Sequence, residues 1–326
     1  MKHLFISSII IFLANCSVNP VTGKQDFVMI SENQEIQMGR EYNAQILKQS
    51  PKYLDQNLQD YVQSIGESLA AKSHRPNLVY RFTVIDSPDI NAFALPGGYI
   101  FINRGLMAYL SSEEELAAVL GHEIGHVTAR HSVRQYSQSQ LMGILSTAVE
   151  INAGRTAGNI ANLASGALLS GYGRDMELEA DDLGAQYIFQ EGYSPQGMFE
   201  VLSVLKDQEI YSKKIAEQRG QEPRSYHGVF ASHPSNDKRL QEVLNNVSNS
   251  FQKGNHKKKD TYLQKIEGMV FGDSEQSGIR RGNKFFHGPL NLYLASPKTW
   301  EIINTPNQLI FSSPSGEAVL QMTLED

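Results

Sequence analysis

The sequence predicts an α+β fold, in which a mainly helical domain holds a small sheet with an edge strand and a small β-containing region follows. Apolar residues recur at helical spacing in several long segments between residues 31 and 250. Short runs rich in β-branched and aromatic residues interrupt these segments, and strand-like alternation returns near the C-terminus. We therefore expect the helical domain over 31–250, a linker over 251–262 and the β-containing accessory region over 263–326.

Residue patterns at their ends mark several of the expected helices. Ser31 followed by Glu32 and Glu35 is typical of a helix start. Ser112 and three following glutamates match the N-terminus of a long helix, which we expect to continue to Arg134. The expected helices cover residues 31–46, 54–71, 112–134, 174–190, 195–211 and 235–247.

Two strand-like runs, 78–85 and 99–103, predict the small sheet of the helical domain. Between them, residues 91–98 form a short extended segment, Asn-Ala-Phe-Ala-Leu-Pro-Gly-Gly, which ends in a turn. Pro96 has no N–H to donate, so this segment suits the edge of a sheet better than its centre. In the accessory region we expect strands near 290–294, 309–311 and 318–324.

Composition excludes several classes of protein. Hydrophobic residues are 40% and charged residues 20% of the chain, which is the balance of a globular protein. The formal charge of −6 gives no sign of a nucleic-acid-binding protein. The sequence contains no GxxxxGK[ST] motif, the pattern that would indicate nucleotide binding. Because Cys16 is the only cysteine, a disulfide within the chain and a cysteine-rich zinc site are both excluded. A metal site must therefore use His, Asp and Glu.

The N-terminus has the pattern of a secreted lipoprotein. Residues 4–14 form an apolar stretch that is too short to span a bilayer and suits a signal peptide over 1–15. The stretch ends in Leu-Ala-Asn-Cys, which resembles the lipobox of bacterial lipoproteins, in which the cysteine is acylated and becomes the first residue after cleavage of the peptide bond that precedes it. We therefore expect a lipidated Cys16, a tether over 16–30 and attachment to a membrane surface in the bacterial periplasm. Ser17 follows the cysteine where Asp could stand, and by resemblance to enterobacterial sorting rules this favours the outer membrane. The alternative is an ordinary signal peptide with a stray buried thiol.

Residues 141–173 are unusually rich in Gly, Ala, Leu and Ile, which leaves two interpretations. The segment could be a membrane-inserted hairpin, or helices that pack beside a functional site. Glu150, Arg155, Asn159 and Asn162 interrupt it before 18 apolar residues accumulate, and this favours packed helices.

The segment Gly121-His-Glu-Ile-Gly-His126 contains the pattern HExxH. Two histidines four residues apart on a helix lie on one face, so both rings reach one ion. Glu123, beside the first histidine, can face a water on that ion without coordinating it. This is the arrangement of zinc peptidases, although two partly buried histidines on an ordinary helix would have the same spacing.

A third metal ligand must come from elsewhere in the chain. The extended zinc motif of metzincins needs a histidine at 132, where this sequence has serine. His131 lies far around a continuous helix from His126, so we expect a surface histidine there. Glu177 and Asp181 share one helix face, where one can bind the ion and the other can accept the ring N–H of a ligating histidine. Glu179 points away from that face and is expected to form a surface pair.

Three motifs in this order resemble one zinc endopeptidase family. They are the HExxH, the later Glu-x-Glu-Ala-Asp at 177–181 and the stretch from His233-Pro-Ser to Arg239. The family includes CAAX prenyl proteases and the heat-shock protease HtpX, and the likeness is greatest to its periplasmic lipoprotein members such as LoiP and BepA. The likeness covers about residues 19–243 and implies a zincin-like fold.

The resemblance implies a role for each of these residues. His122, His126 and Glu177 would bind one zinc ion, Asp181 would support a ligating histidine, and His233 would lie near the metal as a catalytic group. Glu123 would act as general base on a zinc-activated water. The edge segment that aligns substrate in the family corresponds to Asn91, Ala92, Phe93, Ala94 and Leu95.

The expected function is zinc-dependent hydrolysis of peptide bonds in unfolded or misfolded proteins of the bacterial envelope. Pairing with an edge strand needs an extended chain, which explains this class of substrate. Two alternatives stay open: a lipoprotein chaperone or assembly factor with a structural or self-closed zinc site, and an integral membrane protease whose insertion depends on residues 141–173.

Overall fold

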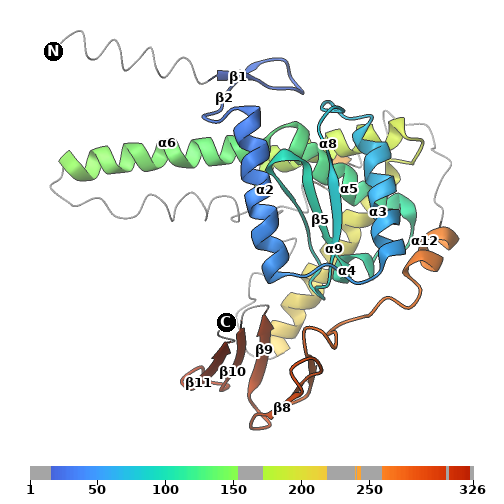
Figure 1. Ribbon diagram of the computed structural model, residues 1–326, viewed down its shortest axis with the longest axis vertical. Coiled ribbons are helices and arrows are strands. Elements are labelled where there is room, and N and C mark those ends of the chain that lie inside the picture. Colours follow the sequence, from blue (N-terminus) through green and yellow to red (C-terminus); the bar gives the residue numbers. More distant parts are fainter. Residues whose placement is uncertain are drawn as a thin grey trace.

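The computed structural model describes residues 16–152, 172–218, 239, 241–243, 259–305 and 308–323. A helical domain surrounds a small three-stranded sheet, and two further small sheets lie at one end of the molecule (Figure 1). This arrangement confirms the predicted α+β fold with a mainly helical domain. The expected signal peptide over 1–15 lies outside the described residues, as do His233 and most of the helix expected over 235–247.

The segment that the sequence predicts as a tether contains a short hairpin. Strands β1 (Cys16–Val18) and β2 (Gln25–Phe27) pair antiparallel. Asn19 stabilises the turn between them, because its side-chain oxygen accepts the backbone N–H groups of Val21 and Thr22. The hairpin contacts the main domain, where Arg130 donates to the Ser17 hydroxyl.

Two capped helices follow the hairpin. Helix α2 (Glu32–Gln49) begins with a capping box between Ser31 and Gln34. Helix α3 (Gln56–Ala70) begins at Asp55, whose carboxylate accepts the N–H of Leu58. Both helices lie close to the ranges expected from the sequence.

The sheet of the helical domain has the order β3–β5–β4. Strands β3 (Arg81–Ile85) and β5 (Tyr99–Asn103) are parallel, and β4 (Ala92–Leu95) pairs antiparallel with β5 at the edge. The 3-10 turn η1 (Pro96–Gly98) joins β4 to β5, with φ of 75° at Gly97 and 89° at Gly98. The short helix α4 (Arg104–Met107) follows directly. The segment expected at a sheet edge is therefore an edge strand.

Helix α5 (Glu113–Thr128) forms the centre of the domain, and all its residues are buried. The expected single helix to Arg134 is wrong: α5 ends at Thr128 and α6 (His131–Asn152) begins three residues later. Arg130, at the junction, has a left-handed φ of 55°. This strained conformation is held by a buried ion pair, with Arg130 Nε 2.8 Å from Glu35 Oε2.

Helix α8 (Arg174–Gln190) crosses α5 at very short distance, and α9 (Gln196–Gln218) packs beside both. A Cβ atom on Gly125 would lie 2.8 Å from the carbonyl oxygen of Ala180, and one on Gly184 would lie 2.8 Å from the backbone nitrogen of His122. Glycine at these positions therefore allows the two helices to touch backbone to backbone. This contact brings the acidic residues of α8 against the histidines of α5.

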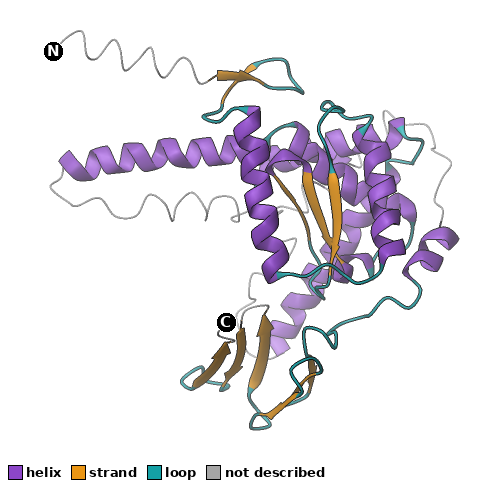
Figure 2. Cartoon of the chain, in the orientation of Figure 1, coloured by secondary structure: helices purple, strands orange, loops and turns teal. Residues whose placement is uncertain are grey.

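Helix α12 (Lys259–Ile266) crosses the expected boundary between linker and accessory region. Its Tyr262 is buried in the core of the helical domain and donates to the carbonyl oxygen of Met107. Two three-stranded antiparallel sheets then share a small core around Phe285 and Phe311 (Figure 2). Their strands are β6 (Ile279–Arg281), β7 (Lys284–His287), β8 (Leu292–Ala295), β9 (Glu301–Thr305), β10 (Gln308–Ser312) and β11 (Val319–Thr323).

Helix α6 projects away from the helical body in Figure 1. It includes the first part of the apolar segment 141–173, and residues 153–171 lie outside the described part of the chain. None of the described helices is long and apolar enough to cross a membrane.

Candidate metal centre

Three side chains from α5 and α8 meet at one point in the core. Nε2 of His122 and Nε2 of His126 are 3.0 Å apart. Glu177, on the first turn of α8, places Oε2 3.6 Å from Nε2 of His122 and Oε1 3.6 Å from Nε2 of His126. All three residues are buried. The structure thus brings together the three residues named as ligands from the sequence.

The dimensions of this cluster fit a divalent metal ion. Ligand atoms about 2.0–2.1 Å from a tetrahedral zinc ion lie roughly 3.3 Å from one another, close to the observed separations. Among the described residues, these three form the group whose ligand atoms all lie within 4.8 Å of one another. Two imidazoles and a carboxylate are also a donor set that zinc prefers.

Asp181 and Arg239 hold the first histidine in place. Asp181 Oδ1 lies 2.8 Å from Nδ1 of His122, so this carboxylate leaves Nε2 to face the metal position. Arg239 donates to both oxygens of Asp181 at 2.7 Å, and its Nη1 lies 2.9 Å from Glu177 Oε2. Burial alone would raise the pKa of Asp181, but the charge and hydrogen bonds of Arg239 outweigh it and hold this pKa well below its usual range.

The second histidine has a different partner. Nδ1 of His126 lies 2.8 Å from Nδ1 of His131, whose Nε2 lies 3.0 Å from Glu179 Oε2. The expectation of a surface histidine at 131 is therefore wrong: its side chain is fully buried, because the break at Arg130 turns it back onto His126. Burial lowers the pKa of His131 more than Glu179 raises it, which favours a neutral ring.

Glu179 lies where the helix geometry of the sequence predicts, away from the metal position. Its side chain is 25% exposed and pairs with Arg134 at 3.1 Å as well as with His131. The expected surface pair is present, but the same carboxylate also reaches a buried histidine. Helix α8 therefore supports both histidines of α5: Asp181 contacts His122 directly, and Glu179 reaches His126 through His131.

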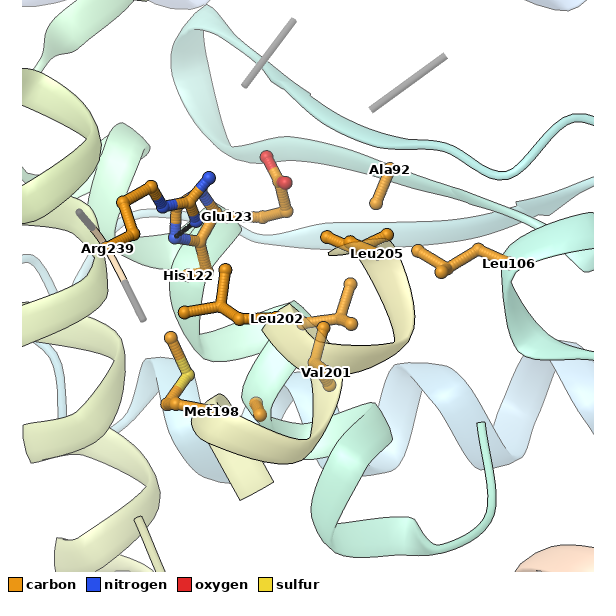
Figure 3. Close-up of a pocket in the computed structure, with 11 residues that line it drawn as sticks. Ala92, Leu106, His122, Glu123, Met198, Val201, Leu202, Leu205 and Arg239 are labelled. Atoms are coloured by element: carbon orange, nitrogen blue, oxygen red, sulfur yellow. Dashed lines mark hydrogen bonds between the residues drawn. The ribbon is translucent and has the colours of Figure 1, made fainter. Parts of the chain in front are cut away.

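Glu123 lies beside a pocket that opens between α5, the edge strand and α9 (Figure 3). Its carboxyl group is buried, and Ala92 of β4 lines the same pocket. The rest of the lining is apolar except for Arg239 and His122, and its apolar residues are Leu106, Ala118, Val119, Met198, Val201, Leu202 and Leu205. Ala92, His122 and Glu123 thus line one pocket.

The remaining residues expected to bind substrate follow the geometry of β4. Ala94 and Leu95 are buried with Ala92, whereas Asn91 and Phe93 are partly exposed. The ring of Phe93 stacks on Phe101 of the neighbouring strand at 4.9 Å. On its outer edge, β4 pairs with no other strand in the described part of the chain, so its backbone is in position to take an additional strand.

Comparison with known families identifies the family of this chain. The sequence profile of peptidase family M48 matches residues 56–247, which is more than half of the chain and includes the three candidate ligands. The chain belongs to peptidase family M48. This confirms both the family expected from the motifs and the predicted class of enzyme, a metallopeptidase.

Curated relatives of this M48 protein include two beta-barrel assembly-enhancing proteases. The protein from Yersinia pestis is 31% identical over 241 residues, covering 70% of this chain and 47% of the relative. That from Escherichia coli strain K12 is 29% identical over 280 residues, covering 82% and 55%. Metalloprotease YcaL of the same strain is 28% identical over 174 residues, covering 51% and 62%. The chain spans about half the length of the first two relatives.

Sequence reasoning missed two groups that the structure places in the M48 site. The sequence marks Arg239 only as the end of a family motif, and no local signal places it beside Asp181, because the two residues are distant in the chain. The sequence also predicts a surface position for His131, because no signal in it marks the left-handed Arg130. His233 and the side chain of Cys16 lie outside what the structure describes, so their roles stay predictions.

Proposed function

We propose that this M48 protein is a zinc-dependent endopeptidase with one zinc ion per chain, held by His122, His126 and Glu177. The observation that carries the proposal is the meeting of these three side chains beside Glu123, next to an edge strand. A zinc ion bound there supplies a Lewis acid, which acidifies a water molecule and polarises the scissile carbonyl.

The residues of the chain perform the proton transfers. Glu123 is the general base: it accepts a proton from the attacking water and passes it to the leaving amine. Asp181 and Arg239 fix the ring of His122, so the site keeps its geometry while the substrate changes shape. His233 is proposed as a hydrogen-bond donor to the oxyanion, on the strength of the family resemblance alone.

Substrate binding is proposed to extend the sheet. An extended peptide would pair with the backbone of Asn91–Leu95, and this main-chain pairing tolerates many sequences. The apolar wall of the pocket, with Leu202 and Leu205 of α9, would receive an apolar side chain near the scissile bond. Such a site requires a chain that is already extended, so we propose unfolded or misfolded proteins as substrates.

The cellular setting follows from the N-terminus and from the relatives. We propose that Cys16 is lipidated and that the enzyme works in the bacterial periplasm, attached to the outer membrane. The hairpin after Cys16 rests on the main domain through Arg130, so the anchor would lie close to the enzyme. Two relatives are named for enhancing β-barrel assembly, which supports envelope proteins as the class of substrate.

A cleavage assay with Glu123→Gln tests the catalytic proposal. With casein as an unfolded substrate, this variant should lose about 100- to 10,000-fold in rate, because it lacks the general base but keeps its size. Glu67→Gln, on an exposed position of α3, is the matched control and should cleave like wild type.

Equal cleavage by wild type and Glu123→Gln would contradict the metallopeptidase mechanism. If wild type binds zinc but cleaves nothing, while both proteins suppress aggregation of an unfolded substrate, the chaperone alternative is favoured instead. The two proposals therefore give opposite results in one set of measurements.

A further inference from the structure

His131 occupies a position that neither the motif nor the family assignment explains. It begins α6, its side chain is fully buried, and it lies between a metal-binding candidate and a carboxylate. The distance from its Nδ1 to Nδ1 of His126 is 2.8 Å, and from its Nε2 to Glu179 Oε2 it is 3.0 Å. Both ring nitrogens of His131 therefore have a hydrogen-bond partner.

The direction of these hydrogen bonds follows from what His126 must do. A ligand that offers the lone pair of Nε2 to a metal carries its proton on Nδ1, so His126 donates and His131 accepts. A neutral His131 then carries its own proton on Nε2 and donates it to Glu179. In this series of hydrogen bonds from His126 to His131 to Glu179, each ring N–H has an acceptor, and the tautomer of His126 is fixed.

Packing restricts the ring of His126 further. Tyr172 stacks on it with ring centroids 4.0 Å apart and planes 18° from parallel. The hydroxyl of Tyr172 lies 2.6 Å from that of Ser132, the residue after His131. The first turn of α6 therefore supports the ring of His126 both at its edge and, through Tyr172, at its face.

The break between α5 and α6 makes this arrangement possible. On a continuous helix, residue 131 would lie far around the axis from residue 126. The left-handed Arg130, paired with Glu35, redirects the chain so that His131 returns to His126. The strain at Arg130 thus has a structural consequence at the metal centre.

We propose that His131, oriented by Glu179, is a positioning residue that fixes the tautomer and orientation of the second histidine ligand, His126. This inference rests on the proposed zinc site. It gives the two histidines separate supports: a carboxylate with a buried arginine for His122, and a neutral histidine with a partly exposed carboxylate for His126.

Zinc affinity of purified variants tests this role without relying on activity. His131→Phe keeps an aromatic ring but cannot accept the hydrogen bond from Nδ1–H of His126, so zinc should bind about 10- to 100-fold more weakly. His131→Asn offers its amide oxygen near the position of Nδ1 and should recover most of the affinity. The visible spectrum of the Co²⁺-loaded protein should change for His131→Phe and stay close to wild type for His131→Asn.

His74→Phe is the matched control. His74 also bonds through Nδ1, but to the hydroxyl of Tyr187, at 2.7 Å and away from the metal position. This variant should bind zinc like wild type. If metal-free His131→Phe unfolds like wild type yet keeps full zinc affinity and an unchanged Co²⁺ spectrum, the positioning role is wrong. A wild-type protein that binds no zinc would instead refute the proposed function itself.

A second pair of variants decides the question if His131→Phe does not fold. Glu179→Ala removes the carboxylate that accepts the Nε2–H of His131, at a partly exposed position. Zinc affinity should fall by about 3- to 10-fold, which is less than for loss of His131 itself. Arg134→Gln breaks the pair between Arg134 and Glu179 but leaves Glu179 facing His131, so zinc affinity should not change. Equal affinity for Glu179→Ala and wild type would overturn the proposal.

Discussion

At the scale of single residues, Arg239 provides the positive charge that stabilises the buried carboxylates on one face of α8. Asp181 and Glu177 are both buried, and Arg239 is within 2.9 Å of each. Two carboxylates out of contact with water are stable only when a cation faces them. The guanidinium of Arg239 therefore stabilises the fold and also holds Asp181 in contact with His122.

Arg239→Met should destabilise the metal-free protein by about 3–5 kcal/mol, because it leaves two buried carboxylates without their partner. The loss of stability should be smaller with zinc present, since the ion then provides a positive charge that faces the Glu177 carboxylate. Denaturant unfolding with and without a chelator measures both values. Arg280→Gln, at an exposed pair with Asp273, is the control and should cost less than about 1 kcal/mol. Equal losses in the two variants would contradict this account of Arg239.

Residues that act through local spacing could be predicted from the sequence. The pairs His122 and His126, and Glu177 and Asp181, are each four apart on a helix, and regular helix geometry places them. The partners of these residues could not be predicted. His131 depends on one left-handed residue, and Arg239 comes from a distant segment, so only the folded chain shows either contact.

At the scale of elements, the contact between α5 and α8 determines the size of the metal centre. Gly125 and Gly184 let the two backbones meet, and Glu177 reaches the histidines because of this. Helix α8 matches its predicted range, since its helical periodicity and the glycine that follows it, Gly192, are local signals. The break between α5 and α6 was not predictable, because arginine rarely adopts a positive φ and is held there by Glu35, far away in sequence.

Gly125→Ala should weaken zinc binding about tenfold or more. Its new methyl group would lie 2.8 Å from the carbonyl oxygen of Ala180, and the shift of α8 that relieves this contact moves Glu177 away. Competition with a chromophoric chelator measures the affinity. Gly173→Ala, just before α8, adds a methyl group that meets no atom of the described residues within 4 Å, so this variant should bind zinc normally. Wild-type affinity in Gly125→Ala would show that the close contact is not what positions the ligands.

At the scale of the whole molecule, the N-terminal hairpin and the C-terminal sheets are both attached to the helical domain. Ser17 bonds to Arg130 in the junction between α5 and α6, and Ser274 bonds to Asp86, which directly follows β3. Strand-like alternation was enough to predict β-structure near the C-terminus. Its attachment, through Tyr262 and the buried Arg104, depends on contacts between distant segments that sequence patterns do not show.

Cys16→Ser should move the protein from the membrane fraction to the soluble fraction, because the acyl chains on Cys16 are the proposed anchor. Fractionation of cells that produce each form measures this, and an unchanged zinc content verifies that the soluble variant is folded. A variant that stays with the membrane after a high-salt wash would show that another segment holds the protein there, and would favour the integral membrane alternative.

The zinc content of wild type and Glu177→Ala, measured by mass spectrometry on purified protein, tests the central claim most directly. We expect about one zinc ion per wild-type chain and a large loss in Glu177→Ala, because two histidines alone bind zinc weakly. Full zinc occupancy in Glu177→Ala would contradict the claim that α5 and α8 together form the metal centre.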